Sequence, residues 1–185
     1  ISALGRLVTT ALEAHLRLPA GAMTDHMSKP ISQLRLLHYV RQAATVERKS
    51  VNMGVHTDYE CLTLLHTRNQ GLQVMTQDDK WIDVPADPDA LVVNIGDMME
   101  AWSNGIFRST PHRVLNLHRY SLPYFVATNY NTLIKPFAQL FGEGQKPKYE
   151  PFYAGAHLER MLVRDSPICA TASRKRRAQE QAVIR

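Results

Sequence analysis

Cysteine is scarce in this sequence, and its scarcity excludes one class of small protein. Only two cysteines, Cys61 and Cys169, occur among 185 residues. They are too few for the disulfide framework of a small secreted domain, and they lack the paired spacing of a structural zinc site. A reducing, intracellular setting is therefore expected, with the cytoplasm as its compartment.

Long hydrophobic runs are missing as well. No stretch approaches the roughly 20 apolar residues that cross a bilayer, so no membrane association is expected. The first residues show neither the basic segment nor the apolar core of a signal peptide. The chain also contains no internal repeat and no glycine-rich phosphate loop. The chain does not begin with methionine, so a processed, truncated or fragmentary chain is expected.

Acidic residues are slightly outnumbered, but the excess positive charge lies in one place. The chain has 22 Lys and Arg against 17 Asp and Glu, a net charge of +5. Without residues 174–185 the counts become 17 basic and 16 acidic. No aromatic residues interleave with these terminal charges, as a surface for single-stranded nucleic acid would require. A flexible basic tail over 166–185 is expected; nucleic-acid binding is not favoured, and nuclear import is a minor alternative.

The pattern of apolar residues changes along the chain. Near the start they recur at helical spacing, which predicts a helix over residues 2–17 that ends before Pro19 and Gly21. A second helix is predicted over 153–163. Between them, short β-rich runs are separated by turn residues: 34–40, 51–56, 62–66, 72–75, 81–84, 91–95, 107–115 and 119–128. This pattern of many short strands between two helices predicts a mainly β sandwich or barrel with flanking helices, and argues against a doubly wound α/β fold.

Three residues form a candidate metal site. His56 and Asp58 are two positions apart, so in a β-strand their side chains would project to the same face. His112, which lies 54 positions beyond Asp58, is the candidate third ligand. Two imidazoles and one carboxylate on one face of an octahedron leave the other positions open, as non-haem Fe(II) oxygenases require. A closed structural zinc site would instead use a full set of protein ligands, often thiolates.

The surrounding motifs occur in a specific order. They occupy residues 54–59, 62–65, 71–74, 81–85, 93–97, 102–105, 109–114 and 119–123. This series resembles the C-terminal catalytic region of the 2-oxoglutarate/Fe(II)-dependent dioxygenases of the isopenicillin N synthase-like group. The resemblance extends from about residue 34 to residue 163, which is most of the chain.

The resemblance implies a fold and a domain organisation. The fold is a double-stranded β-helix, a distorted jelly roll of cupin-like type, occupying residues 31–165. Residues 1–30 would be a helix and linker that remain from a longer N-terminal region, so the jelly roll is expected to lack its N-terminal part.

The resemblance also implies roles for individual residues. His56, Asp58 and His112 would bind Fe(II). Arg119 and Ser121 match the Arg-x-Ser pair that binds the distal carboxylate of 2-oxoglutarate, and a guanidinium with a hydroxyl on one strand face suits a buried carboxylate. Tyr39 matches the tyrosine whose hydroxyl assists at the same carboxylate.

Two positions depart from the family pattern. Many relatives have proline after the tyrosine, whereas Val40 stands here. Glycine is common two places after the metal-binding aspartate, but this chain has Glu60, which either shapes the mouth of the pocket or faces solvent.

The function that these motifs imply is oxidation of a small organic molecule by Fe(II), 2-oxoglutarate and O₂, with release of succinate and CO₂. Ascorbate stays open as a further cofactor. Two alternatives also stay open: an iron oxidase that closes rings or desaturates without 2-oxoglutarate, and an incomplete, inactive metal-binding module. The sequence indicates neither a particular substrate nor an oligomeric state.

Overall fold

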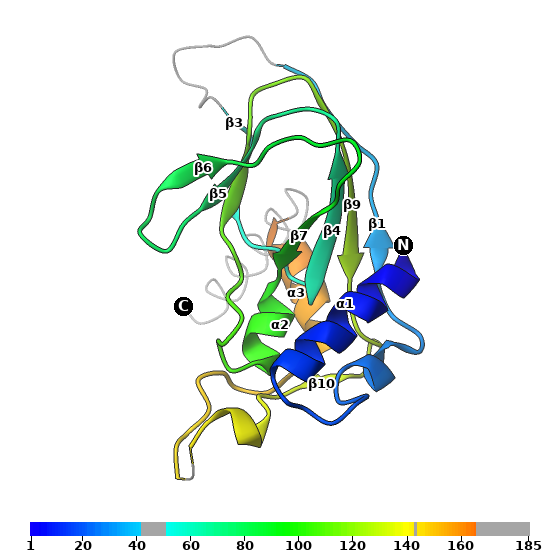
Figure 1. The fold of residues 1–185 in the computed structure, drawn as a ribbon, viewed down its shortest axis with the longest axis vertical. Helices are drawn as coiled ribbons and strands as arrows, with labels where there is room; N and C mark the ends of the chain where they lie inside the picture. Colours follow the sequence, from blue (N-terminus) through cyan, green and yellow to red (C-terminus); the bar gives the residue numbers. More distant parts are fainter. Residues whose placement is uncertain (42–50, 143, 166–185) are drawn as a thin grey trace, which may run out of the picture.

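Two antiparallel β-sheets form the body of the molecule (Figure 1). The computed structural model describes residues 1–41, 51–142 and 144–165, so the predicted tail over 166–185 lies outside the described residues. The first sheet has the order β1-β9-β4-β7 with β2 also paired to β9, and the second has the order β3-β8-β5-β6. The prediction of a mainly β jelly roll with flanking helices is confirmed.

The strands of the two sheets alternate along the chain. The first sheet contains β1 (Gln33–Leu34), β2 (Leu37–Tyr39), β4 (Leu62–Thr67), β7 (Val92–Ile95) and β9 (Arg119–Val126). The second contains β3 (Val51–His56), β5 (Leu72–Met75), β6 (Trp81–Asp83) and β8 (His112–Leu115). A separate pair joins β10 (Leu133–Ile134) to β11 (Phe152–Tyr153).

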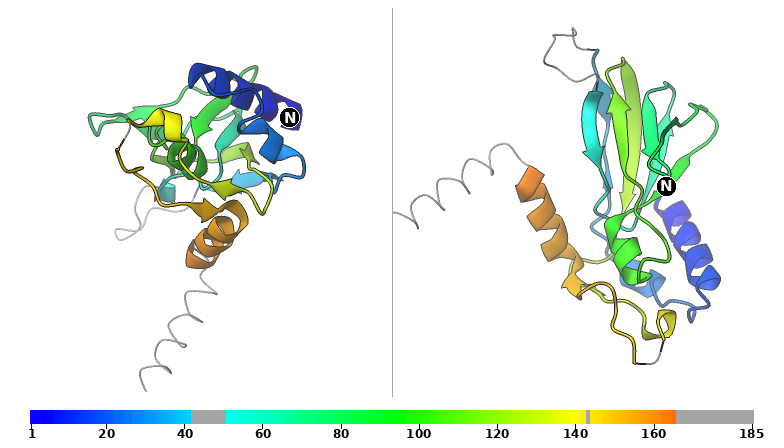
Figure 2. Two further views of the ribbon diagram at one scale, coloured as in Figure 1. Left: turned by 90° about the horizontal axis from the view of Figure 1, so that it is seen from below. Right: turned by 90° about the vertical axis from the view of Figure 1, so that its left-hand side faces the viewer.

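Helices gather at one end of the sheets. They are α1 (Ser2–His15), α2 (Asp97–Trp102) and α3 (Ala154–Asp165), with the short 3-10 helices η1 (Thr24–Met27) and η2 (Ala138–Leu140). Figure 1 shows α1 and α2 at the lower end of the sheets, and the right-hand view of Figure 2 shows α3 standing to one side of them. No helix among the described residues is long and apolar enough to cross a membrane.

The hydrophobic core lies between these helices and the first sheet. The buried side chains come from β4, α2 and the segment after α1, with Leu62, Met98, Trp102, Leu16 and Met23 as representatives. Burial of such side chains removes apolar surface from water and holds the helices against the sheet. The opposite side of the first sheet is thereby left to face the second sheet.

The structure differs from the predicted elements at several places. The first helix ends at His15, because Arg17 takes a positive φ of 53° and Leu18 N donates to Glu13 O. The run 34–40 is divided into β1 and β2, and within the run 107–115 only β8 (His112–Leu115) is a strand.

Helix α2 (Asp97–Trp102) has no counterpart among the predicted elements. Asp97 begins this helix, where an acidic side chain suits the N-terminal end of the helix dipole. The Asp97 amide also donates to the Asp58 carbonyl, so the start of the helix is tied to the turn after β3.

Gly96 allows this helix to pack against the turn between β3 and β4. A Cβ at Gly96 would overlap the carbonyl oxygen of Glu60 and lie 3.0 Å from that of Asp58. We expect Gly96→Ala to lower the free energy of unfolding by about 1–3 kcal/mol, because backbone would have to move. Gly54→Ala is the matched control, since nothing lies within 4 Å of its Cβ position. Denaturant unfolding of both variants tests this, and equal stability would contradict the close approach.

Candidate metal centre

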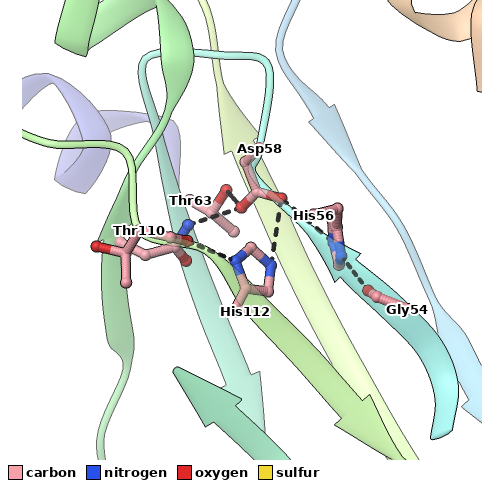
Figure 3. A network of polar contacts seen from close by, with 7 residues as sticks. Gly54, His56, Asp58, Thr63, Thr110 and His112 are labelled. Carbon is pink, nitrogen blue, oxygen red and sulfur yellow. Dashed lines mark hydrogen bonds and ion pairs between the residues drawn. The ribbon is translucent and has the colours of Figure 1, made fainter. Parts of the chain in front are cut away.

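Strand pairing brings the two predicted histidine ligands together. β3 and β8 are antiparallel neighbours, and their register places His56 directly opposite His112. The centroids of the two imidazole rings lie 4.2 Å apart. Asp58 follows the end of β3 and turns its carboxylate back toward the pair (Figure 3). Pairing of β3 with β8 therefore brings Asp58 close to His112, although the two residues are 54 positions apart in the sequence.

The candidate ligand atoms converge on one point. Asp58 Oδ1 lies 3.9 Å from His56 Nε2 and 3.6 Å from His112 Nε2. One ligand atom from each of the three residues lies within 4.8 Å of the others, so the group could hold a metal ion. No other such group of three occurs in the part of the chain that the structure describes.

Both imidazoles are oriented by the backbone. His56 Nδ1 lies 2.9 Å from the Gly54 carbonyl oxygen, and His112 Nδ1 lies 3.0 Å from that of Thr110. A carbonyl only accepts, so each Nδ1 carries the proton and donates it. In the neutral tautomer that donates from Nδ1, Nε2 keeps its lone pair, which is the state that a metal ligand requires. Figure 3 shows both contacts.

The Asp58 carboxylate is oriented by its second oxygen. Thr63 Oγ1 donates to Asp58 Oδ2 at 2.5 Å, and Asn94 Nδ2 donates to the same oxygen at 2.7 Å. These bonds occupy Oδ2 and leave Oδ1 directed at the histidines. Such partners of a ligating carboxylate fix its orientation and tune metal affinity.

Sequence reasoning missed Thr63 and Asn94 as site residues. Their register makes them direct neighbours across β4 and β7. Each is a polar residue with apolar neighbours, Thr63 between Leu62 and Leu64 and Asn94 between Val93 and Ile95. A polar residue between apolar ones was therefore the signal, but the pairing of the strands was needed to interpret it.

Loss of the Asn94 contact should weaken the metal site without destroying it. We expect Asn94→Ala to lower Fe(II) affinity by about 10- to 100-fold, because Asp58 loses one of two bonds that aim it. Metal titration of the purified variant measures the change. Asn131→Ala, at an exposed asparagine outside the cavity, is the matched control. Equal affinity in Asn94→Ala and wild type would show that Asn94 does not orient the ligand.

Burial also favours the uncharged histidine. The His112 pKa is lowered chiefly by burial, with Asp58 opposing the shift and His56 adding to it. A neutral imidazole is the form that binds metals, so the surroundings of His112 prepare it for that role.

Arg119 lies buried in the same cavity. Its side chain is 1% exposed, and its Nε donates to Thr67 Oγ1 at 3.1 Å. Its Nη2 has no hydrogen-bond partner among the described residues. A buried donor without a partner is costly, so the surroundings of this guanidinium suit an anion. A carboxylate bound bidentately would satisfy it.

Ser121 and Tyr39 lie beside Arg119. Along β9 the exposure alternates, so that Arg119 and Ser121 are both buried on one face while Tyr120 between them is exposed. Tyr39 in β2 is the register partner of Arg119, and its ring centroid lies 6.0 Å from Arg119 Cζ. Burial is the main cause of a raised Tyr39 pKa, which keeps its phenol protonated and able to donate. Val40, in place of proline, is exposed.

One cavity of about 400 Å³ contains all six residues that the sequence singles out. Its lining includes His56, Asp58, His112, Arg119, Ser121 and Tyr39. Much of the remaining wall is apolar, formed by residues such as Leu37, Leu65, Leu72, Val74 and Val114. An apolar cavity with a few convergent polar groups is the usual form of a small-molecule site.

Glu60, one of the two departures from the family pattern, also lines this cavity. Its side chain is 3% exposed, so it does not face solvent. Burial foremost, together with the nearby Asp58, raises the Glu60 pKa to about 7.

A model of the 2OG-Fe(II) oxygenase superfamily matches residues 30–128 of the sequence. The chain is 33% identical over 148 residues to the 2-oxoglutarate-dependent dioxygenase tropC of Talaromyces stipitatus, covering 77% of this chain and 45% of that protein. It is 38% identical over 116 residues to the homoarginine-6-hydroxylase 2-ODD-C23 of Glycine max, covering 58% and 35% respectively.

Solved structures show the same likeness. The fold matches a full-length Neurospora crassa protein, solved in complex with alpha-KG and thymine, with a TM-score of 0.82 at 29% identity. The match covers 89% of this chain and 54% of that one. The chain thus spans about half the length of the solved relative, and less than half of the curated relatives above.

Proposed function

Because the chain belongs to the 2OG-Fe(II) oxygenase superfamily, we propose that it oxidises a small organic molecule with Fe(II), 2-oxoglutarate and O₂. The observation that carries this proposal is the buried Arg119, whose Nη2 lacks a partner in the same cavity as the histidine–aspartate group. A cation in that position suits a dicarboxylate that reaches from the metal to the cavity wall.

His56, Asp58 and His112 are the residues that would hold the iron. The donor set fits, since two imidazoles and one carboxylate suit a ferrous ion with open positions. The two Nδ1–H groups and the Asp58 Oδ2 are already engaged, so the three inward atoms remain for the ion. When bound, iron with 2-oxoglutarate and O₂ supplies the oxidising chemistry that yields succinate, CO₂ and oxidised substrate.

Arg119, Ser121 and Tyr39 would bind the distal carboxylate of 2-oxoglutarate. Arg119 supplies charge and a pair of donors, while the Ser121 and Tyr39 hydroxyls supply one donor each. Thr67 holds the guanidinium through Nε, so its other nitrogens keep their direction when the anion arrives. A dicarboxylate held at Arg119 would have its other end free to reach the candidate metal ligands, which line the same cavity.

The apolar wall would hold the substrate and exclude water. Leucine and valine side chains on β4, β5 and β8 enclose the space beside Asp58 and His112. Displacing water there strengthens the polar contacts within the cavity and limits side reactions. Among the related proteins, the one from Neurospora crassa is solved with thymine and with 5-formyluracil, and 2-ODD-C23 is named for homoarginine. A small organic substrate is therefore the class we propose.

The two alternative functions receive less support. An oxidase that does not use 2-oxoglutarate would have no use for a buried guanidinium with an unpaired donor in this cavity. An inactive module would not need both a converging metal group and this anion site in one cavity.

Product analysis tests the proposal. The protein is incubated with Fe(II), 2-oxoglutarate and O₂, and succinate is measured with and without nucleobases, flavonoids, plant hormones and amino-acid derivatives. We expect iron-dependent succinate formation that one of these substrate classes accelerates. A metal-chelated sample is the control. Succinate formation at the same rate in that control would contradict the proposal, as would its absence although iron and 2-oxoglutarate are bound.

A further inference from the structure

Glu60 is a buried acid for which the proposed chemistry has no use. Its side chain is 3% exposed and lines the cavity, yet no arginine or lysine of the described residues forms an ion pair with it. Its carboxylate accepts a hydrogen bond from its own backbone amide, but it has no ion-pair partner. A buried carboxylate without such a partner is unfavourable, and a cationic or N–H-bearing ligand would relieve that cost.

The topology places Glu60 away from the proposed 2-oxoglutarate anchor. Glu60 precedes Cys61, whose amide donates to the Val126 carbonyl at the Leu62 end of β4. Ser121 of the anchor pairs with Thr67, at the other end of the same strand. The two ends of β4 are about 16 Å apart, at roughly 3.3 Å per residue. Glu60 and the anchor thus belong to opposite ends of the cavity.

The metal group lies between these ends. Thr63, next along β4 from Leu62, holds Asp58 Oδ2. With 2-oxoglutarate bound toward Arg119, the space on the Glu60 side of Asp58 is what remains for the substrate. An ionised carboxylate in that position would repel an anion, so it does not suit a second carboxylate of the cosubstrate.

We propose that Glu60 selects the substrate, by accepting hydrogen bonds from an ammonium, guanidinium or ring N–H group on it. This inference rests on the proposed function, because it assigns the substrate end of the same cavity. A nitrogen donor paired with a carboxylate forms a short, charge-assisted bond, and apolar walls strengthen it. The substrate class is therefore a nitrogen-bearing molecule with at least one N–H donor.

The neighbouring charges agree with this assignment. Arg35 also lines the cavity, and its charge lowers the Glu60 pKa. Its guanidinium, however, lies over the Phe125 ring, with Cζ 5.0 Å from the ring centroid, and donates to Gln33. It therefore does not neutralise Glu60 by contact. Asp97 adds negative charge near Glu60, which favours a cationic or N–H-bearing partner further.

Binding of three probes that share a phenethyl group tests the proposal. Phenethylamine, 2-phenylethanol and 3-phenylpropionate offer an ammonium, a hydroxyl and a carboxylate. Each is titrated calorimetrically, without O₂, into the full chain loaded with Fe(II) and 2-oxoglutarate. Wild type should bind the amine at least about tenfold more tightly than the alcohol, with the carboxylate weakest.

Variants at one position assign that preference to Glu60. In Glu60→Gln, which keeps the shape, and in Glu60→Gly, the amine should lose about tenfold in affinity while the alcohol changes less than about threefold. Glu150→Gln, at an exposed acid outside the cavity, should behave as wild type. An unchanged amine preference in both Glu60 variants would overturn the proposal. So would a wild type without that preference, including one that binds none of the probes.

The same samples separate this inference from the proposed function. Titration with 2-oxoglutarate before the probes reports on the Arg119 end of the cavity. Failure of that step counts against the proposed function, whereas the amine preference can still be measured in the iron-loaded protein without 2-oxoglutarate.

Discussion

Asp58→Ala is expected to abolish stable iron binding. Asp58 Oδ1 is the atom that both histidine Nε2 atoms approach, at 3.9 Å and 3.6 Å, and it supplies the only negative charge of the group. Without it, two neutral imidazoles hold the ion. We expect Fe(II) affinity to fall by more than about 100-fold, beyond the 10- to 100-fold typical of losing an outer-shell partner. Iron content after gel filtration measures this.

A second aspartate provides the control for this variant. Asp89→Ala removes an exposed carboxylate outside the cavity and should leave iron content unchanged. Thermal unfolding of both metal-free variants shows whether the fold persists. A folded Asp58→Ala protein that keeps one iron per chain would contradict the proposed ligand set.

Arg119→Ala is expected to remove 2-oxoglutarate binding while sparing iron. The guanidinium is the positive charge at its end of the cavity, and its Nη2 has no hydrogen-bond partner among the described residues. We expect the dissociation constant for 2-oxoglutarate to rise by more than about 100-fold, since a charge-assisted bidentate contact is lost. Calorimetric titration of the iron-loaded variant without O₂ measures this.

Two further variants show whether geometry or charge matters at this position. Arg119→Lys keeps the charge but not the planar pair of donors, so it should bind 2-oxoglutarate with intermediate affinity. Arg68→Ala removes an exposed arginine outside the cavity and should match wild type. If Arg119→Ala binds 2-oxoglutarate as wild type does, Arg119 is not part of that site.

Much of the metal group could be predicted because its residues belong to short motifs that can be recognised in the sequence. The two-residue spacing of Arg119 with Ser121 predicts a shared strand face, and β9 shows that alternation. The same prediction for His56 and Asp58 was wrong, because β3 ends at His56 and Asp58 reaches the site from the turn that follows. The motif order predicted that His112 would join a pair 54 positions upstream of it. The structure supplies the reason, which is the cross-strand register of His56 with His112.

The rest depended on tertiary structure. Thr63 and Asn94 become partners of Asp58 only through the pairing of β4 with β7. Helix α2 (Asp97–Trp102) was missed because six residues carry little periodicity, and its position is determined by packing of Gly96 against the turn after β3. Whether Glu60 faced solvent or the cavity was likewise decided by folding of that turn.

The measurement that tests the central claim most directly is anaerobic absorption spectroscopy with Fe(II) and 2-oxoglutarate. If His56, Asp58 and His112 hold iron with open positions and Arg119 anchors the cosubstrate, wild type develops the weak visible charge-transfer band of the chelate. Arg119→Ala, although it binds iron, does not develop the band at the same 2-oxoglutarate concentration. Iron-loaded wild type without the band would contradict the assignment of this cavity to Fe(II) and 2-oxoglutarate.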